Sequence, residues 1–179
     1  MRVDTGERAH ARGLVLLVGG ARSGKSRLAL ERAQALPGEL IYVATGEALD
    51  AEMSKRIARH RAERGPRWRT VEAPLDLSDA IARESREENV LVVDCLTLWL
   101  SNLILGERDV EAATANLLEV LERRRGTVLL VSNEVGMGIV PENALARRFR
   151  DDAGRLNQAV AQVADEVLLV CAGLALRMK

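Results

Sequence analysis

The chain has 179 residues, of which 47% are hydrophobic, and it carries 26 basic and 26 acidic residues, so its formal net charge is zero. A chain of this length can bury one sizeable core but hardly two, which predicts a single domain. Because the charges balance, no whole-chain field points to nucleic acid or to a membrane surface as a partner, and any basic effect has to be local.

The N-terminal residues 1–13 form a polar extension of mixed charge ahead of the first apolar run. That run, LVLLV at 14–18, is far too short for the apolar region of a signal peptide or for a membrane span. We therefore expect a cytoplasmic protein without a membrane span, with residues 14–179 as its folded domain.

Apolar, β-branched runs alternate along the chain with longer amphipathic stretches. The runs predict strands buried on both faces, over 14–18, 40–44, 90–94, 128–132 and 167–171. The amphipathic stretches predict helices over 25–35, 48–63, 76–86, 96–105, 109–124 and 142–163. We also expect a short strand at 68–72 and an antiparallel edge strand in the last residues, 175–179. The alternation predicts an α/β fold, with a mostly parallel sheet flanked by helices.

The strongest motif is GGARSGKS, from Gly19 to Ser26, which matches G-x-x-x-x-G-K-S between a predicted strand and a predicted helix. In such a P-loop the backbone N–H groups and the helix N-terminus cradle phosphates, while Lys25 reaches the β- and γ-phosphates and the Ser26 hydroxyl ligates Mg²⁺. The alternative is a chance glycine-rich turn. The motif and its flanks predict a P-loop NTPase fold.

Two further strand ends are expected to border the P-loop. Asp94 closes the run VLVVD and is the candidate to hold Mg²⁺, directly or through water. Its alternative role is the N-cap of the following helix, and the two roles are compatible. Thr45 and Gly46 leave the strand at 40–44, and ligands of an open parallel sheet lie outside the carboxyl ends of its strands. The alternative for Thr45 is a simple turn.

The stretch RIARHRAER, from Arg56 to Arg64, gathers four arginines around His60, one of only two histidines in the chain. On a helical wheel His60 shares an inward stripe with Met53 and Ile57, which fits a histidine packed in the core. Arginines one turn away on either side suit instead a groove that receives phosphate. Because a neutral imidazole is a competent nucleophile toward phosphorus, the cluster suggests a covalent step.

The two cysteines, Cys95 and Cys171, lie at the ends of apolar runs and show no CxxC spacing. This placement predicts two buried thiols rather than a disulfide or a metal site.

The stretch SNEVGMGIVPEN at 132–143 follows a predicted strand and is expected to overhang the same crevice. An ordinary turn with a solvated basic helix behind it is the alternative to contact with an acceptor or a phosphate. Arg147, Arg148 and Arg150 are candidate partners for an anion.

Taken together, these blocks closely resemble the bifunctional adenosylcobinamide kinase/adenosylcobinamide-phosphate guanylyltransferase family of cobalamin biosynthesis. The resemblance runs from about Val15 to Lys179 and rests on GGARSGKS, YVATGEALDAEMSKRIARHR, WRTVEAP, VDCLTLWLSNL, SNEVGMGIVPEN and FRDDAGRLNQAVAQVADEVLLV, in this order. It implies two reactions. The γ-phosphate of ATP or GTP passes to the hydroxyl of the aminopropanol arm of adenosylcobinamide, and GMP from GTP is then transferred to that phosphate, giving adenosylcobinamide-GDP and pyrophosphate.

The resemblance also implies roles for individual residues. His60 aligns with the histidine that carries GMP covalently in the family, and Lys25 is the second catalytic candidate. The nucleotide contacts that carry over are Gly19, Gly20, Ala21, Arg22, Ser23, Gly24, Lys25, Ser26, Ala44, Thr45, Gly46, Arg61, Ala62, Glu63, Arg64, Glu72 and Asp94. The family further implies a homotrimer.

Two other functions compete with this interpretation. One is a P-loop binding module, a switch or motor subunit whose nucleotide hydrolysis drives a partner, although the sequence offers no recognisable arginine finger or partner-binding segment. The other is a small-molecule kinase without a covalent intermediate.

Overall fold

The computed structural model describes residues 13–46 and 64–179, so the predicted helix over 48–63 lies outside the described residues. In chain order the elements are β1 (Leu14–Gly19), α1 (Lys25–Gln34), β2 (Glu39–Ala44), β3 (Trp68–Glu72), α3 (Leu77–Glu84), β4 (Asn89–Asp94), α4 (Leu96–Leu105), α5 (Val110–Arg123), β5 (Thr127–Asn133), α6 (Ala144–Val163), β6 (Glu166–Cys171) and β7 (Leu174–Arg177). Within these ranges no helix combines the length and the apolar composition needed to cross a membrane.

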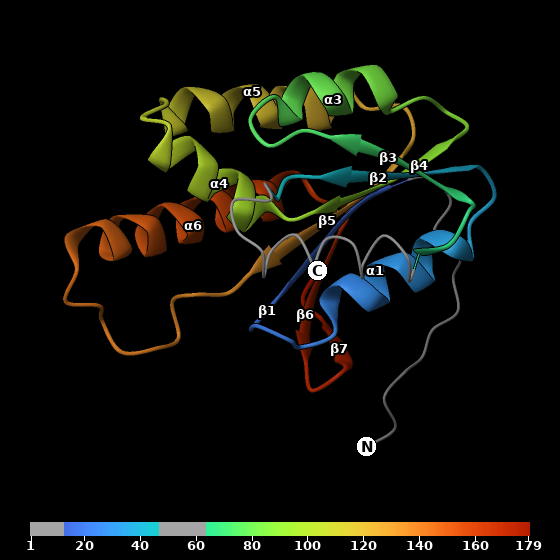
Figure 1. The fold of residues 1–179 in the computed structure, drawn as a ribbon. Helices are drawn as coiled ribbons and strands as arrows, with labels where there is room; N and C mark the ends of the chain where they lie inside the picture. The colour runs from blue at the N-terminus through green and yellow to red at the C-terminus, as the bar shows by residue number, and fades with distance from the viewer. Residues whose placement is uncertain (1–12, 47–63) are drawn as a thin grey trace.

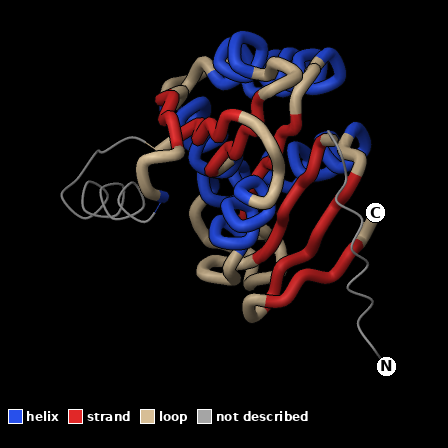
Figure 2. The backbone as a smooth tube through the Cα atoms, turned by 90° about the vertical axis from the view of Figure 1, so that its right-hand side faces the viewer, coloured by secondary structure: helices blue, strands red, loops and turns tan. Residues whose placement is uncertain are grey.

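The strands form one seven-stranded sheet in the order β3-β2-β4-β5-β1-β6-β7. All neighbouring pairs are parallel except β6 and β7, which are antiparallel. The predicted α/β fold is confirmed, and so are the short strand at 68–72 and the antiparallel edge strand. β7 begins and ends slightly earlier than expected, and Figure 2 shows it at the outer edge of the sheet, close to the C-terminus.

Helices cover both faces of this sheet, which is why the central strands are apolar on both sides. Along β1, Leu14 and Leu16 pack into a core with α3, α4, α5 and α6, whereas Val15 and Leu17 pack into a second core with α1. Figure 1 shows these layers, with α1 below the sheet and α3, α4 and α5 above it. Among the described elements, the α1 face is therefore the more thinly covered of the two.

The topology brings several loops to one edge of the sheet. Because β1, β2, β4 and β5 run parallel, the chain leaves all of them at the same edge. β5 lies between β1 and β4 and pairs Asn133 with Gly19 on one side and Val131 with Asp94 on the other. The P-loop and Asp94 are thereby placed at this edge with one strand between them.

The prediction of two buried thiols is wrong for one of them. Cys95 is buried as expected, but Cys171 is exposed, and both are free cysteines. Cys171 is the last residue of β6 and pairs with Leu174 in β7, which is itself exposed. An apolar run at the rim of a sheet loses its cover where the flanking helix ends, so its last residue reaches solvent.

Candidate active site

The loop between β1 and α1 packs tightly against the turn that joins β6 to β7. A Cβ added at Gly19 would lie only 2.1 Å from the carbonyl oxygen of Val170, so only glycine fits there without a backbone shift. Gly24, the N-cap of α1, has a φ of 101°, a backbone conformation that residues other than glycine rarely adopt. The N–H of Gly173 donates to the carbonyl oxygen of Ser23 at 2.9 Å. The C-terminal hairpin therefore supports the P-loop from outside.

Lys25 is the first residue of α1, and its ammonium group lies inside the loop. Nζ donates to the carbonyl oxygens of Gly19 at 2.8 Å and Gly20 at 2.7 Å. The residue is only 5% exposed, and this burial lowers the pKa of Lys25, while Cys95 and Asp94 act in the opposite direction. An ammonium group held by two loop carbonyls can exchange these acceptors for phosphate oxygens with little movement of its stem.

Asp94 ends β4 and is half-buried. The hydroxyl of Tyr42, in the neighbouring strand β2, donates to its Oδ2 at 3.1 Å. The N-cap position of α4 is taken by Cys95, without a capping bond from its side chain, so the alternative role of Asp94 as a helix cap is not borne out. The Asp94 carboxylate is thus held from the side of β2 rather than by the helix that follows it.

Thr45 ties the end of β2 to the start of α4. It is fully buried, and its hydroxyl accepts a hydrogen bond from the Cys95 N–H and donates one to the Cys95 carbonyl, both at 2.7 Å. Its own carbonyl accepts from Asn102 at 2.8 Å. The hydroxyl therefore has a structural role, and the predicted nucleotide contact of Thr45 stays a prediction.

Arg64 is the first described residue after the gap, and it is almost completely buried, with 7% exposure. Its guanidinium carbon lies 3.6 Å from the centre of the Tyr42 ring, and Nη2 donates to the Thr70 hydroxyl at 3.3 Å. Tyr42 thus contacts Arg64 through its ring and Asp94 through its hydroxyl. A role for Tyr42 in the site was not predicted from the sequence, although it is the only tyrosine in the chain and interrupts an aliphatic strand.

The end of β5 is also held by polar contacts. Asn133 donates from its backbone N–H at 3.1 Å and from Nδ2 at 3.0 Å to the hydroxyl of Thr97 in α4. The N–H of Glu134 donates to the carbonyl oxygen of Gly19 at 2.9 Å, and Asn157 in α6 donates to the Asn133 carbonyl. These bonds lock the loop after β5 to the first residue of the P-loop. The sequence pointed to Asn133 and Glu134 by their place at a strand end, but not to Thr97 or Asn157.

The arginines at the start of α6 already have partners within the chain. Arg147 donates to the carbonyl oxygens of Pro141 and Glu142, and the guanidinium groups of Arg148 and Arg150 pair with neighbouring aspartates. The Arg147 bonds tie α6 to the loop that precedes it, whereas the pairs of Arg148 and Arg150 lie within α6. Contact of the three arginines with a bound anion stays a prediction.

The remaining predicted residues divide into two sets. Ala44 and Glu72 end the neighbouring strands β2 and β3 and lie opposite each other at the edge that carries the P-loop, with Glu72 exposed. His60, Arg61, Ala62 and Glu63 lie outside the described residues. The structure therefore brings the P-loop, Asp94, Thr45 and Glu72 to one edge of the sheet.

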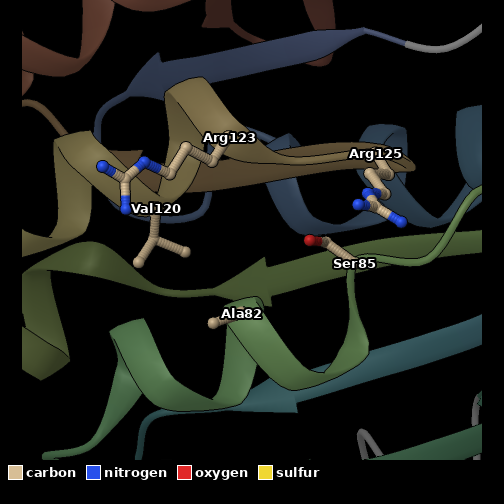
Figure 3. Close-up of a pocket in the computed structure, with 5 residues that line it drawn as sticks. All are labelled: Ala82, Ser85, Val120, Arg123 and Arg125. Atoms are coloured by element: carbon tan, nitrogen blue, oxygen red, sulfur yellow. The ribbon is translucent and has the colours of Figure 1, made fainter.

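Figure 3 shows a pocket elsewhere, between α3 and α5. It is lined by Ala82, Ser85, Val120, Arg123 and Arg125. Ser85 and Arg125 precede β4 and β5, so the pocket lies at the amino ends of these strands, opposite the P-loop. It takes no part in the candidate active site.

The fold and the glycine-lysine loop place the chain among proteins with the P-loop NTPase fold. Among solved structures, the assembled ATPase EscN of the type III secretion system of enteropathogenic Escherichia coli matches 90% of this chain and 43% of its own, with a TM-score of 0.56 at 13% identity. A likeness at this identity establishes the fold alone.

Closer relatives define the family. The family model described as cobinamide kinase / cobinamide phosphate guanyltransferase matches residues 15–178. The bifunctional adenosylcobalamin biosynthesis protein CobP of Pseudomonas aeruginosa is 47% identical over 167 residues, 92% of this chain and 96% of the relative. The corresponding protein CobU of Escherichia coli is 41% identical over 184 residues, 93% and 99% of the two chains. The chain belongs to this family of bifunctional kinases and guanylyltransferases.

The packing of the P-loop predicts a difference between two adjacent glycines. Gly19→Ala should lower the free energy of unfolding by about 1–3 kcal/mol, because the new methyl group meets the rigid backbone of Val170. Gly20→Ala is the matched control, since a Cβ there meets nothing within 4 Å. Urea unfolding of both variants measures the difference. Equal stability of the two variants would show that the backbone of β6 at Val170 does not constrain the loop.

Proposed function

We propose that this chain phosphorylates adenosylcobinamide with ATP or GTP and then transfers GMP from GTP to adenosylcobinamide phosphate through a guanylyl-His60 intermediate. The products are adenosylcobinamide-GDP and pyrophosphate, and the pathway is cobalamin biosynthesis. The observation that carries the proposal is the position of Lys25 inside the P-loop, one strand away from Asp94, in a member of this family.

Phosphoryl transfer requires positioning and charge neutralisation more than covalent chemistry from the protein. The N–H groups of the loop from Gly19 to Ser26 would bind the phosphates, and Lys25 would move from the loop carbonyls to the phosphate oxygens. The acceptor hydroxyl then forms a bond to the γ-phosphorus and loses its proton, as the bond from that phosphorus to the β-γ bridging oxygen breaks. The nucleoside diphosphate leaves.

Ser26 and Asp94 fit the role of magnesium ligands. They offer hydroxyl and carboxylate oxygens, the ligand type that Mg²⁺ prefers. Residues 13–46 and 64–179 contain no group of three or more His, Cys, Asp or Glu side chains arranged to hold a metal. Mg²⁺ is usually bound through one or two protein carboxylates and completes its shell with phosphates and water. Bound there, Mg²⁺ would neutralise charge on the β- and γ-phosphates.

The second reaction would use His60 as the nucleophile. A ring nitrogen forms a bond to the α-phosphorus of GTP while the bond to the bridging oxygen breaks and pyrophosphate leaves. A phosphate oxygen of adenosylcobinamide phosphate then attacks the same phosphorus and releases the histidine. In the sequence, three residues separate His60 from Arg64. Arg64 itself is anchored on Tyr42, next to Asp94.

Family resemblance also supports a homotrimer in the cytoplasm, which we include in the proposal.

Covalent guanylylation can be tested with GTP labelled at the α-phosphate. Wild-type protein incubated with it and Mg²⁺, then denatured, should retain a label that is labile in acid and stable in alkali, as expected of a phosphorus–nitrogen bond. His60→Ala should retain none. Wild-type protein that completes the guanylyl transfer without ever retaining label would overturn the intermediate and leave direct transfer.

The two activities should respond differently to two substitutions. Lys25→Ala removes the positive charge that would contact bound phosphates. It should reduce the rates of both reactions on the order of a hundredfold or more. His60→Ala should abolish guanylyl transfer and spare the kinase, which needs no nucleophile from the protein. Separate assays of adenosylcobinamide phosphorylation and of pyrophosphate release measure the two steps. Loss of kinase activity in folded His60→Ala protein would contradict this division.

A further inference from the structure

Tyr42 occupies a position in the sheet from which it reaches two functional segments. In the register of the strands it pairs with Thr70 in β3 and with Val92 in β4. Side chains two residues apart in a strand point to the same face, so Asp94 follows Val92 on the face that carries Tyr42. The tyrosine is long enough to reach diagonally along this face to the strand end, and its hydroxyl lies 3.1 Å from the Asp94 carboxylate.

The ring of Tyr42 packs against two neighbouring side chains. The guanidinium group of Arg64 stacks on it at 3.6 Å, and Trp68 approaches edge-on, with ring centres 6.5 Å apart and planes at 86°. Tyr42 is 7% exposed and Arg64 likewise. A buried ring with a cation on its face has little rotational freedom, so its hydroxyl is aimed at a fixed point.

The Tyr42 hydroxyl is the donor in this hydrogen bond and the Asp94 carboxylate is the acceptor, which is the complementary arrangement for a phenol and a carboxylate. Among the side chains of the described residues, Tyr42 is the one that hydrogen-bonds the Asp94 carboxylate, and it uses Oδ2.

We propose that Tyr42 is the positioning residue of this active site, which orients the Asp94 carboxylate toward the magnesium–nucleotide complex and is itself clamped by Arg64. This inference rests on the proposed function, in which Asp94 serves the metal. Arg64 follows His60 by four positions in the sequence. The role predicted for Arg64 from the family resemblance is thereby extended from contact with nucleotide to support of Tyr42.

The test separates binding of the metal from binding of the nucleotide. Affinity for a β,γ-imido analogue of GTP, which is not hydrolysed, is measured by calorimetry with saturating Mg²⁺ and again with EDTA. The ratio of the two affinities reports how much the metal adds to binding. Tyr42→Phe keeps the ring and its contact with Arg64 but removes the donor. It should lower this ratio on the order of tenfold and leave the affinity in EDTA unchanged.

Two further variants serve as controls, one expected to lose the effect of the metal and one expected to keep it. Asp94→Asn should abolish most of the Mg²⁺ ratio, because it removes the ligand charge. Val120 of α5 packs against the core on the opposite face of the sheet, so Val120→Ala leaves the surroundings of Tyr42 unchanged and should keep the wild-type ratio. The affinity in EDTA shows in each case that the P-loop is folded.

The outcomes distinguish the role of Tyr42 from the proposed role of Asp94 as a metal ligand. A wild-type ratio in Tyr42→Phe, together with a lost ratio in Asp94→Asn, would overturn the role of Tyr42 and leave the metal assignment intact. A wild-type ratio in Asp94→Asn would overturn both. An equal fall of affinity in Mg²⁺ and in EDTA for Tyr42→Phe would show a general structural role and would also overturn the proposal.

Discussion

Parallel pairing of β5 with both β1 and β4 is the constraint on which the active site depends. Neighbouring strands lie about 4.8 Å apart, so one intervening strand sets the ends of β1 and β4 roughly 10 Å apart. This spacing suits a triphosphate that is held by the P-loop at one end and lies near the Asp94 carboxylate, the proposed magnesium ligand, at the other. The register of β5 with Gly19 and Asp94 is also strictly determined, because a slip of one residue would turn each side chain of β5 to the opposite face of the sheet.

One face of the sheet contributes mainly to stability, and the other carries groups of the candidate active site. Four described helices and the larger core lie on one face, where Trp99 is the one aromatic residue among the buried hydrophobic residues of the cluster. The other face carries α1, Tyr42 and the strand position of Asp94. Because that face has less cover among the described elements, polar groups at the strand ends can be held by specific partners and still meet a ligand. The hydrogen bond from Tyr42 to Asp94 and the stacking of Arg64 on Tyr42 are such partners.

Local patterns in the sequence predicted most of the fold and the core of the site. Apolar runs located the strands, and the glycine-lysine motif located the P-loop, because both depend on residues adjacent in the chain. The position of Asp94 at a strand end also followed from its own run. The support of the P-loop by the turn at Gly173 could not be predicted, because it depends on which strands are neighbours in the sheet.

Tyr42 was missed for the same reason, since its hydrogen bond depends on the register between two strands that lie some fifty residues apart in sequence. The wrong prediction for Cys171 has a related cause. An apolar run looks the same whether a helix covers its last residue or not, and only the tertiary structure shows that β6 ends beside an exposed edge strand.

The most direct test of this account is a crystal structure of the protein with Mg²⁺ and the β,γ-imido analogue of GTP. We expect the phosphates to lie in the loop from Gly19 to Ser26. We expect Lys25 Nζ to have left the carbonyl oxygens of Gly19 and Gly20 for phosphate oxygens. Asp94 should meet the metal ion, directly or through one water, while it keeps its hydrogen bond from Tyr42. Phosphates bound outside the loop, or a metal ion held without Asp94, would contradict it.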